Sequence, residues 1–279
     1  MAKTILIPTD GSDYSQIALD YGIYISKYFD VTLLGLHVID IKIVQGPLFS
    51  DIAFYGGMPA YYEFLPKIEE ALNKRGDSIL QSFQEHCHKA GIPCETKKVL
   101  GLVDETIVEE GEKTDWILLA QKGEHYHLGA GGLLGSTTGC VVRKSKKPLW
   151  VTPSQFKEIE SMGIAYDGSA PADAALKLAV ELSAEAHWPL TAITVTDDHK
   201  LAAELVDRIE DFLAPLEIDG TSVVLQGKAD RAILDFINEG AVELMVMGSQ
   251  SHGRLRDFFL GSTTAHVARN SSIPILIAH

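Results

Sequence analysis

Apolar positions in the first half of the chain follow two alternating spacings. Short runs of consecutive, largely β-branched residues predict strands, and apolar residues three and four positions apart predict helices between them. In chain order we expect a strand at 4–10, a helix at 15–28, a strand at 31–39, a helix at 66–90, a strand at 95–100, a helix at 103–113, a strand at 116–120, a helix at 136–145 and a strand at 148–152.

The second half repeats this alternation. Strands are expected at 164–166, 190–195, 221–226, 243–248 and 274–278, with helices at 199–214, 229–239 and 262–270. Strands that alternate with helices predict a doubly wound α/β fold with a mostly parallel sheet. Such sheets bind ligands beyond the carboxyl ends of their strands, where the strand order reverses.

The chain is an internal duplication. The segment 7–26 matches 164–183 at a constant offset of 157 residues, and 133–151 matches 259–277 at an offset of 126. We therefore predict two homologous domains, 1–153 and 160–279, with 31 extra residues in the first, at about 40–70. This insertion is rich in aromatic residues, glycine and proline, and it suits a long packed loop or, alternatively, a lid or partner surface.

The composition of the chain indicates which partners it can bind and in which compartment it is expected. The formal net charge of −14 gives an acidic surface that repels nucleic acid and anionic membranes. The three cysteines, Cys87, Cys94 and Cys140, form no CxxC pattern, which fits a reducing compartment. The chain shows neither a signal-peptide core nor an apolar run long enough to span a bilayer, so we expect a cytoplasmic protein.

Small residues surround the last helix of the second half. Gly248 ends a buried strand and Gly261 opens the helix together with two hydroxyl residues, where free amides and the helix dipole suit a phosphate. A capped helix with nothing bound is the alternative. Asp10 and Asp167 follow the first strand of each half, where a carboxylate suits hydrogen bonds from a ribose or adenine, or else caps the next helix.

These features together resemble the universal stress protein family. The resemblance rests on the Asp-Gly-Ser after the first strand, on His37-Val38 after the second strand and on a terminal Gly-x2-Gly-x9-Gly-Ser/Thr loop, and it covers nearly the whole chain. The family implies Rossmann-like (adenine nucleotide α-hydrolase-like) domains, each a five-stranded, mostly parallel sheet with helices on both faces. It also implies a role in stress response.

The same resemblance implies a ligand and an assembly. Members pair through the last strand of each domain, so a tandem chain resembles that dimer made within one molecule, with a homodimer of tandem chains left open. One subclass binds ATP between the first strand and the glycine loop, as a regulatory ligand. Because this chain is acidic, an ATP site would also need Mg²⁺.

In the second half the glycine loop is the better kept. The family's first and third loop glycines fall on Gly248 and Gly261, but its second falls on Ser251, whose Cβ either crowds the phosphates or brings a hydroxyl donor to them. The resemblance implies a nucleotide site, preferred in this half, at Ala165 (where the family has proline), Asp167, Val195 (beside adenine), Gly227, Met247, Gly248, Ser251, His252, Gly253, Gly261, Ser262 and Thr263.

In the first half the strand ends match better and the loop matches worse. Ala120 replaces the first loop glycine, and eleven residues, where the family has nine, separate Gly123 from Gly135. The implied site, weaker than that of the second half, comprises Pro8, Asp10, Val38, Gly101, Gly123, Gly135, Ser136 and Thr137. We expect one working site in the second half and a degenerate, structural one in the first.

Other chemistries fit poorly. The chain has no GxxxxGK[ST] loop, the glycines at 129–135 miss the GxGxxG spacing, and the serines after Gly248 miss GxSxG. The run at 85–88 (Glu-His-Cys-His) points to different helix faces, so no metal site is expected. No general base is in view, so we expect a nucleotide-binding regulator and no enzyme, with slow ATP hydrolysis or autophosphorylation left open. The alternative is an interaction module that binds no nucleotide and uses 40–70 as its contact surface.

Overall fold

A computed structural model describes residues 3–45, 58–124, 134–216, 218–249 and 260–279. The first half contains β1 (Lys3–Pro8), α1 (Asp13–Ile25), β2 (Val31–Asp40), α2 (Ile41–Gln45), α4 (Met58–Ala90), β3 (Cys94–Gly101), α5 (Val103–Gly111), β4 (Trp116–Ala120), α6 (Ser136–Lys144) and β5 (Leu149–Thr152). The second contains β6 (Met162–Ala165), α7 (Ala170–Ala186), β7 (Leu190–Val195), α8 (His199–Leu213), the 3₁₀ turn η2 (Ala214–Leu216), β8 (Gly220–Leu225), α9 (Ala229–Asn238), β9 (Leu244–Gly248), α10 (Ser262–Asn270) and β10 (Ile275–Ala278).

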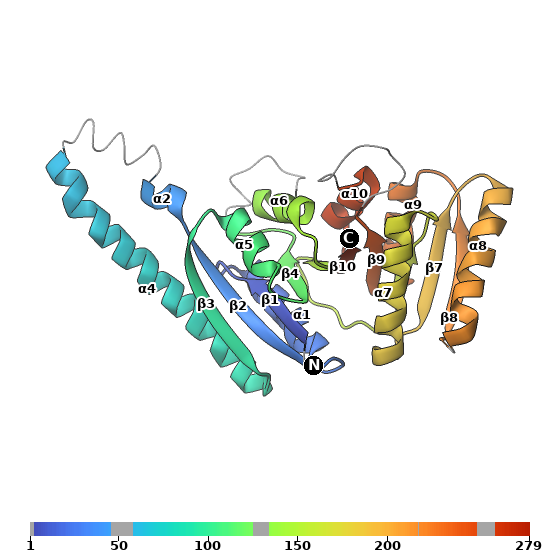
Figure 1. Ribbon diagram of the computed structural model, residues 1–279, viewed down its shortest axis with the longest axis horizontal. Helices are drawn as coiled ribbons and strands as arrows, with labels where there is room; N and C mark the ends of the chain where they lie inside the picture. The colour runs from blue at the N-terminus through green and yellow to red at the C-terminus, as the bar shows by residue number, and fades with distance from the viewer. Residues whose placement is uncertain (1–2, 46–57, 125–133, 217, 250–259) are drawn as a thin grey trace.

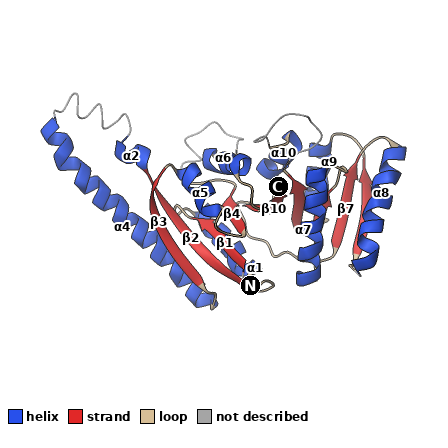
Figure 2. Ribbon diagram, viewed as in Figure 1, coloured by secondary structure: helices blue, strands red, loops and turns tan. Residues whose placement is uncertain are grey.

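The strands form one continuous sheet through both halves (Figures 1 and 2). Its ten strands lie in the order β3-β2-β1-β4-β5-β10-β9-β6-β7-β8. The pairs within each half are parallel, whereas β5 and β10 pair antiparallel through residues 149–151 and 275–277. The predicted α/β fold with two Rossmann-like, five-stranded halves is confirmed, and the two halves meet through their last strands within the chain.

Helices cover both faces of the sheet. Successive side chains of a strand point to opposite faces, and accordingly Ile5 and Ile7 of β1 belong to one core while Leu6 belongs to another. The first core includes side chains of α1, α4, α7 and α8, and the second includes side chains of α5, α6, α9 and α10. Because both faces are buried, central strands such as β4 (WILLA) are apolar at nearly every position.

The inserted segment is largely helical where it is described. The sequence predicted a helix from residue 66, but α4 begins at Met58 and runs for 33 residues with Pro66 inside it. A proline usually lies in the first turn of a helix or ends one, so the local pattern suggests too late a start. A long packed loop at 40–70 is therefore wrong for residues 41–45 and 58–70, and residues 46–57 lie outside the described part of the chain.

The second part of α4 packs closely on the sheet. A Cβ added to Gly35 of β2 would lie 2.8 Å from the Phe83 ring, and one added to Gly11 would lie 2.9 Å from Ile79. Figure 1 shows the first turns of α4 continuing past the edge of the sheet, next to α2. No helix among the described residues, α4 included, combines the length and the apolar character that crossing a membrane requires.

The connection between β5 and β6 is fixed to α1 by a tyrosine. The Tyr24 hydroxyl accepts a hydrogen bond from the Ile159 N–H (3.0 Å) and donates one to the Ile159 carbonyl (2.9 Å). Tyr24 and Ile159 are both buried. One phenol thus satisfies two backbone groups that lie outside any strand or helix, as buried backbone requires.

Replacing Tyr24 with phenylalanine should lower the free energy of unfolding by about 1–3 kcal/mol, because it leaves buried backbone groups without partners. Urea denaturation followed by circular dichroism measures the loss. Tyr21→Phe is the matched control, since the Tyr21 hydroxyl accepts from the N–H of the exposed Lys157, where water can replace it. Equal losses in the two variants would contradict the assignment.

Candidate functional site

A cavity of about 590 Å³ lies in the first half of the molecule. Its walls include residues that directly follow β1 (Thr9 and Asp10) and residues that directly follow β4 (Lys122 and Gly123). These strands are neighbours at the centre of the half, and the chain leaves them in opposite directions across the sheet. The cavity therefore occupies the point of strand-order reversal where doubly wound folds bind ligands.

The lining combines an apolar set and a polar set of side chains. The apolar residues include Leu36, Val38, Val103, Ile107, Leu119 and Leu134, and the polar and charged residues include Asp10, His37, Asp40, Arg75, Lys122, Glu124, Ser136 and Thr137. Ligand sites for small molecules commonly have this mixture, in which apolar surface supplies affinity and a few polar groups fix orientation.

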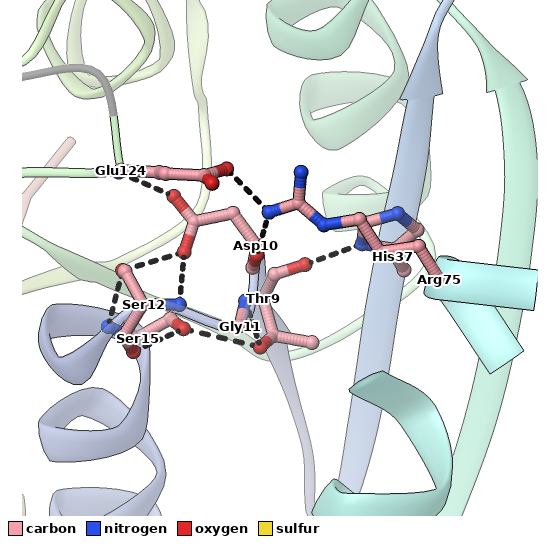
Figure 3. Close-up of polar contacts among 8 residues, drawn as sticks. All are labelled: Thr9, Asp10, Gly11, Ser12, Ser15, His37, Arg75 and Glu124. Atoms are coloured by element: carbon pink, nitrogen blue, oxygen red, sulfur yellow. Dashed lines mark hydrogen bonds and ion pairs between the residues drawn. The ribbon is translucent and has the colours of Figure 1, made fainter. Parts of the chain in front are cut away.

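Asp10 joins the loops that follow β1 and β4 (Figure 3). Its Oδ1 accepts hydrogen bonds from the Ser12 N–H (3.0 Å) and the Ser12 hydroxyl (2.6 Å), and its Oδ2 accepts one from the Glu124 N–H (2.8 Å). Ser12 in turn caps α1 by accepting from the Ser15 N–H (3.2 Å). The aspartate is thus not the cap itself, because it holds the capping serine and the second loop.

The carboxyl group of Asp10 stays ionised at neutral pH. Burial alone raises its pKa, but the hydrogen bonds from the Ser12 side chain, from the Glu124 and Ser12 amides and from Ser15 outweigh burial and lower the pKa below its usual value. Asp10 is therefore a fixed negative charge and hydrogen-bond acceptor in the cavity wall.

Helix α4 closes the cavity from the side of β2. A Cβ added to Gly76 would lie 2.8 Å from the His37 ring, so the helix lies directly against that histidine. His37 Nδ1 lies 2.8 Å from the Thr9 carbonyl, and since a carbonyl only accepts, Nδ1 carries the proton. Arg75, which precedes Gly76 in α4, forms an ion pair with Glu124 at an N–O distance of 2.6 Å, and Figure 3 shows this pair.

The loops before α6 and α10 are anchored in the same way. The Gly135 N–H donates to the Gln121 carbonyl (2.9 Å), and the Thr138 hydroxyl donates to the Ala120 carbonyl (2.8 Å). In the second half Gly261 donates to Ser249 (2.8 Å) and Thr264 donates to Gly248 (2.8 Å). This correspondence makes Ala120 the structural equivalent of Gly248.

Close packing against α7 explains why position 248 is a glycine. A Cβ there would lie 2.7 Å from the carbonyl carbon of Pro171 in α7, and backbone atoms cannot move away cheaply. Because helix packing requires this glycine, Ala120 in the first half does not argue against a ligand. Gly123 is different, since a Cβ there would lie 2.9 Å from Asp10 Oδ2, in the polar part of the cavity.

The cavity brings together most of the residues predicted for the first half. Pro8, Asp10, Val38, Gly123, Gly135, Ser136 and Thr137 all line it. Gly101 is not among the described lining residues. It ends β3, where a Cβ would lie 2.5 Å from the Thr106 hydroxyl, so its lack of a side chain serves the contact with α5.

The residues predicted for the second half lie at equivalent places where they are described. Ala165, Val195 and Met247-Gly248 end the neighbouring strands β6, β7 and β9, and Asp167 Oδ1 accepts from the Ser169 N–H (3.0 Å). Gly227 has a positive φ of 96° and donates to Asp197 (3.1 Å). Gly261 precedes α10, which Ser262 and Thr263 begin. Ser251, His252 and Gly253 lie outside the described residues, so the second-half loop stays a prediction.

Sequence reasoning missed the contribution of α2 and α4 to the first-half cavity. Ile43 of α2, and Leu72 and Arg75 of α4, line the cavity beside the predicted residues. Nothing in the local pattern marks Arg75. The available signal is Gly76, since a glycine inside a helical pattern often marks a close approach of backbone.

Three comparisons with known proteins bear on this fold and site. The family model described as "Universal stress protein family" matches residues 1–153 and 158–279. Universal stress protein Slr1230 of Synechocystis sp. is 29% identical over 98% of this chain and 99% of its own length. Universal stress protein MJ0531 of Methanocaldococcus jannaschii is 30% identical over 56% of this chain and 85% of its own length.

The fold has a solved counterpart. The crystal structure of a universal stress protein from Archaeoglobus fulgidus matches with a TM-score of 0.77 at 23% identity, covering 99% of this chain and 97% of that one. Both halves match the family model, and the duplicated α/β architecture agrees with a solved member. The chain therefore belongs to the universal stress protein family.

Proposed function

We propose that this chain is a stress-response regulator that binds an adenine nucleotide, ATP in the first instance, in the cavity of its first half. The observation that carries the proposal is the convergence of Pro8, Asp10, Val38, Gly123, Gly135, Ser136 and Thr137 on that one cavity. The preference for the second half depended on the loop at 250–259, which lies outside the described residues. It stays a separate prediction.

The first-half residues fit such a ligand group by group. Val38, Leu36 and Leu119 supply apolar surface for a base, and the ionised Asp10 supplies an acceptor for ribose hydroxyls. The N-cap of α6 is Gly135, which has no side chain to cap the first turn. Within the described part of the chain nothing accepts from the amides of Ser136 and Thr137, so these amides suit an anion at the cavity wall.

Magnesium would enter with the nucleotide. Within the described part of the chain, no cluster of three or more His, Cys, Asp or Glu side chains is placed to hold a metal ion. Mg²⁺ typically keeps several waters and binds through substrate phosphates with one or two carboxylates. A nucleotide complex of Mg²⁺ therefore suits the site better than a resident ion.

We also infer a regulatory and not a catalytic role. The ionised groups at the cavity are held in hydrogen bonds and ion pairs, as Asp10 is by Ser12 and Glu124, which suits binding more than proton transfer.

A tryptophan at Val38 should abolish nucleotide binding, because the indole would fill the apolar part of the cavity. Val195→Trp is the matched control, since Val195 is the counterpart of Val38 at the offset of 157 residues. We expect about one nucleotide per chain, measured by chromatography after denaturation and by titration with MgATP, and its loss in Val38→Trp alone.

The opposite pattern, loss in Val195→Trp alone, would move the site to the second half. Nucleotide absent from the purified protein, together with no binding of MgATP on titration, would overturn the proposal. It would leave the interaction module, with the inserted segment as the next surface to test.

Replacing Asp10 with asparagine should lower the free energy of unfolding by about 1–2 kcal/mol at pH 7, because an amide cannot accept all three hydrogen bonds. The folded pKa of Asp10 is lowered, so its stabilisation is present above the unfolded pKa of about 3.9 and is lost as pH falls through the folded pKa. The gap between wild type and variant in urea denaturation should therefore shrink below about pH 4.

The control for Asp10 is Asp20→Asn, which alters a side-chain contact with Gln16 within α1. A gap between wild type and Asp10→Asn that is the same at pH 7 and pH 3 would show that ionisation of Asp10 is not its source.

A further inference from the structure

Arg75 is a cation that the helix of the inserted segment brings to the cavity. Its Nη2 lies 2.6 Å from Glu124 Oε2 and 3.5 Å from the Asp10 carbonyl oxygen. The two side chains of the pair are 50% and 39% exposed. An ion pair that is this accessible to water adds little to stability, so its partners can be exchanged at low cost.

The described residues that line the cavity include more carboxylates than lysine and arginine side chains. The described lining residues include the carboxylates Asp10, Asp40 and Glu124 against the cations Arg75 and Lys122. The loop that follows, residues 125–135, contains no lysine or arginine. Among the described lining residues, Arg75 and Lys122 are therefore the lysine and arginine cations available to a phosphate, and the Glu124 carboxylate repels it.

The side chains of Asp10 and Glu124 differ in how firmly they are held. Asp10 is held by three hydrogen bonds that also fix the loops. The Glu124 side chain is held by Arg75, while the Glu124 backbone N–H stays on Asp10. The side chain of Glu124 can thus leave Arg75 without breaking the loop anchor. A guanidinium released in this way presents a planar fork of donors that suits phosphate oxygens.

The position of this arginine is particular to the first half. At the offset of 126 residues its counterpart is Leu201 of α8. Helix α8 has an arginine about two turns later, Arg208, but that side chain pairs with Asp173 of α7 and donates to the Gly168 carbonyl (3.2 Å). The covering helix thus supplies an arginine in each half, but Arg75 pairs with Glu124 in the loop after β4, whereas Arg208 pairs with Asp173 of α7.

We infer that Arg75 exchanges Glu124 for a phosphate group of the bound nucleotide, so that the first-half site selects phosphorylated adenine nucleotides over adenosine. This inference deepens the proposed function and rests on it. Glu124 then acts as an internal competitor, which occupies the arginine until a phosphate replaces it.

Isothermal titration of the full chain with MgATP and, separately, with adenosine tests the exchange. Arg75→Gln should weaken MgATP binding about ten- to hundredfold, the factor expected for a lost charge-assisted hydrogen bond, and should leave adenosine affinity within about twofold. Glu124→Gln should tighten MgATP binding, because it frees Arg75 and removes a repelling charge.

The matched control is Lys98→Gln. This change breaks the Lys98–Asp77 ion pair (2.6 Å), which also ties α4 to the sheet, and Lys98 is not among the described lining residues. Both affinities should stay at the wild-type values. Melting temperatures of all variants verify that each is folded.

Two results would overturn the inference while the proposed function stands. One is an unchanged MgATP affinity in Arg75→Gln, and the other is an equal loss for MgATP and adenosine, which would mean that Arg75 only supports the cavity wall. A wild-type chain that binds neither ligand would instead refute the proposed first-half nucleotide site itself.

Discussion

The antiparallel pairing of β5 with β10 makes the two halves one molecule. Both strands are buried along their whole length and largely apolar, and an unpaired apolar edge of this kind is a template for aggregation. Pairing them within the chain removes both edges at once. Since the strands meet in the middle of the sheet, the two apolar cores run across the junction and are shared by both halves.

This junction also brings the candidate site into contact with the other half. Gln121 lies between two cavity residues, Ala120 and Lys122, and its buried side-chain amide donates to the carbonyls of Ala268 (2.9 Å) and Ser271 (3.0 Å) at the end of α10. These two hydrogen bonds join the loop after β4 to the end of α10 in the other half.

A helix covers the loop after the first strand in both halves, but this helix is much longer in the first half. Leu205 of α8 lies under Gly168 as Ile79 of α4 lies under Gly11, with hypothetical Cβ contacts of 2.7 Å and 2.9 Å. The common part of the helix thus has the same packing role in both halves. The insertion at 40–70 lengthens α4 on its N-terminal side and provides Ile43 of α2 to the cavity wall. Leu72 and Arg75, which follow the insertion in the same long helix, also line the cavity.

The sequence alone determined the features that repeat or have a local period. Its offsets revealed the duplication, its alternating strands and helices predicted the parallel sheet, and Asp10 and Gly123 identified loops that do meet at one cavity. Tertiary structure decided the rest. Packing between elements placed the start of α4 before Pro66 and brought Arg75 next to Glu124. It also left no room for a side chain at position 248, where the backbone of Pro171 lies close. These are contacts between segments far apart in the chain, and local periodicity carries no information about which distant side chains meet, since packing between whole elements settles that.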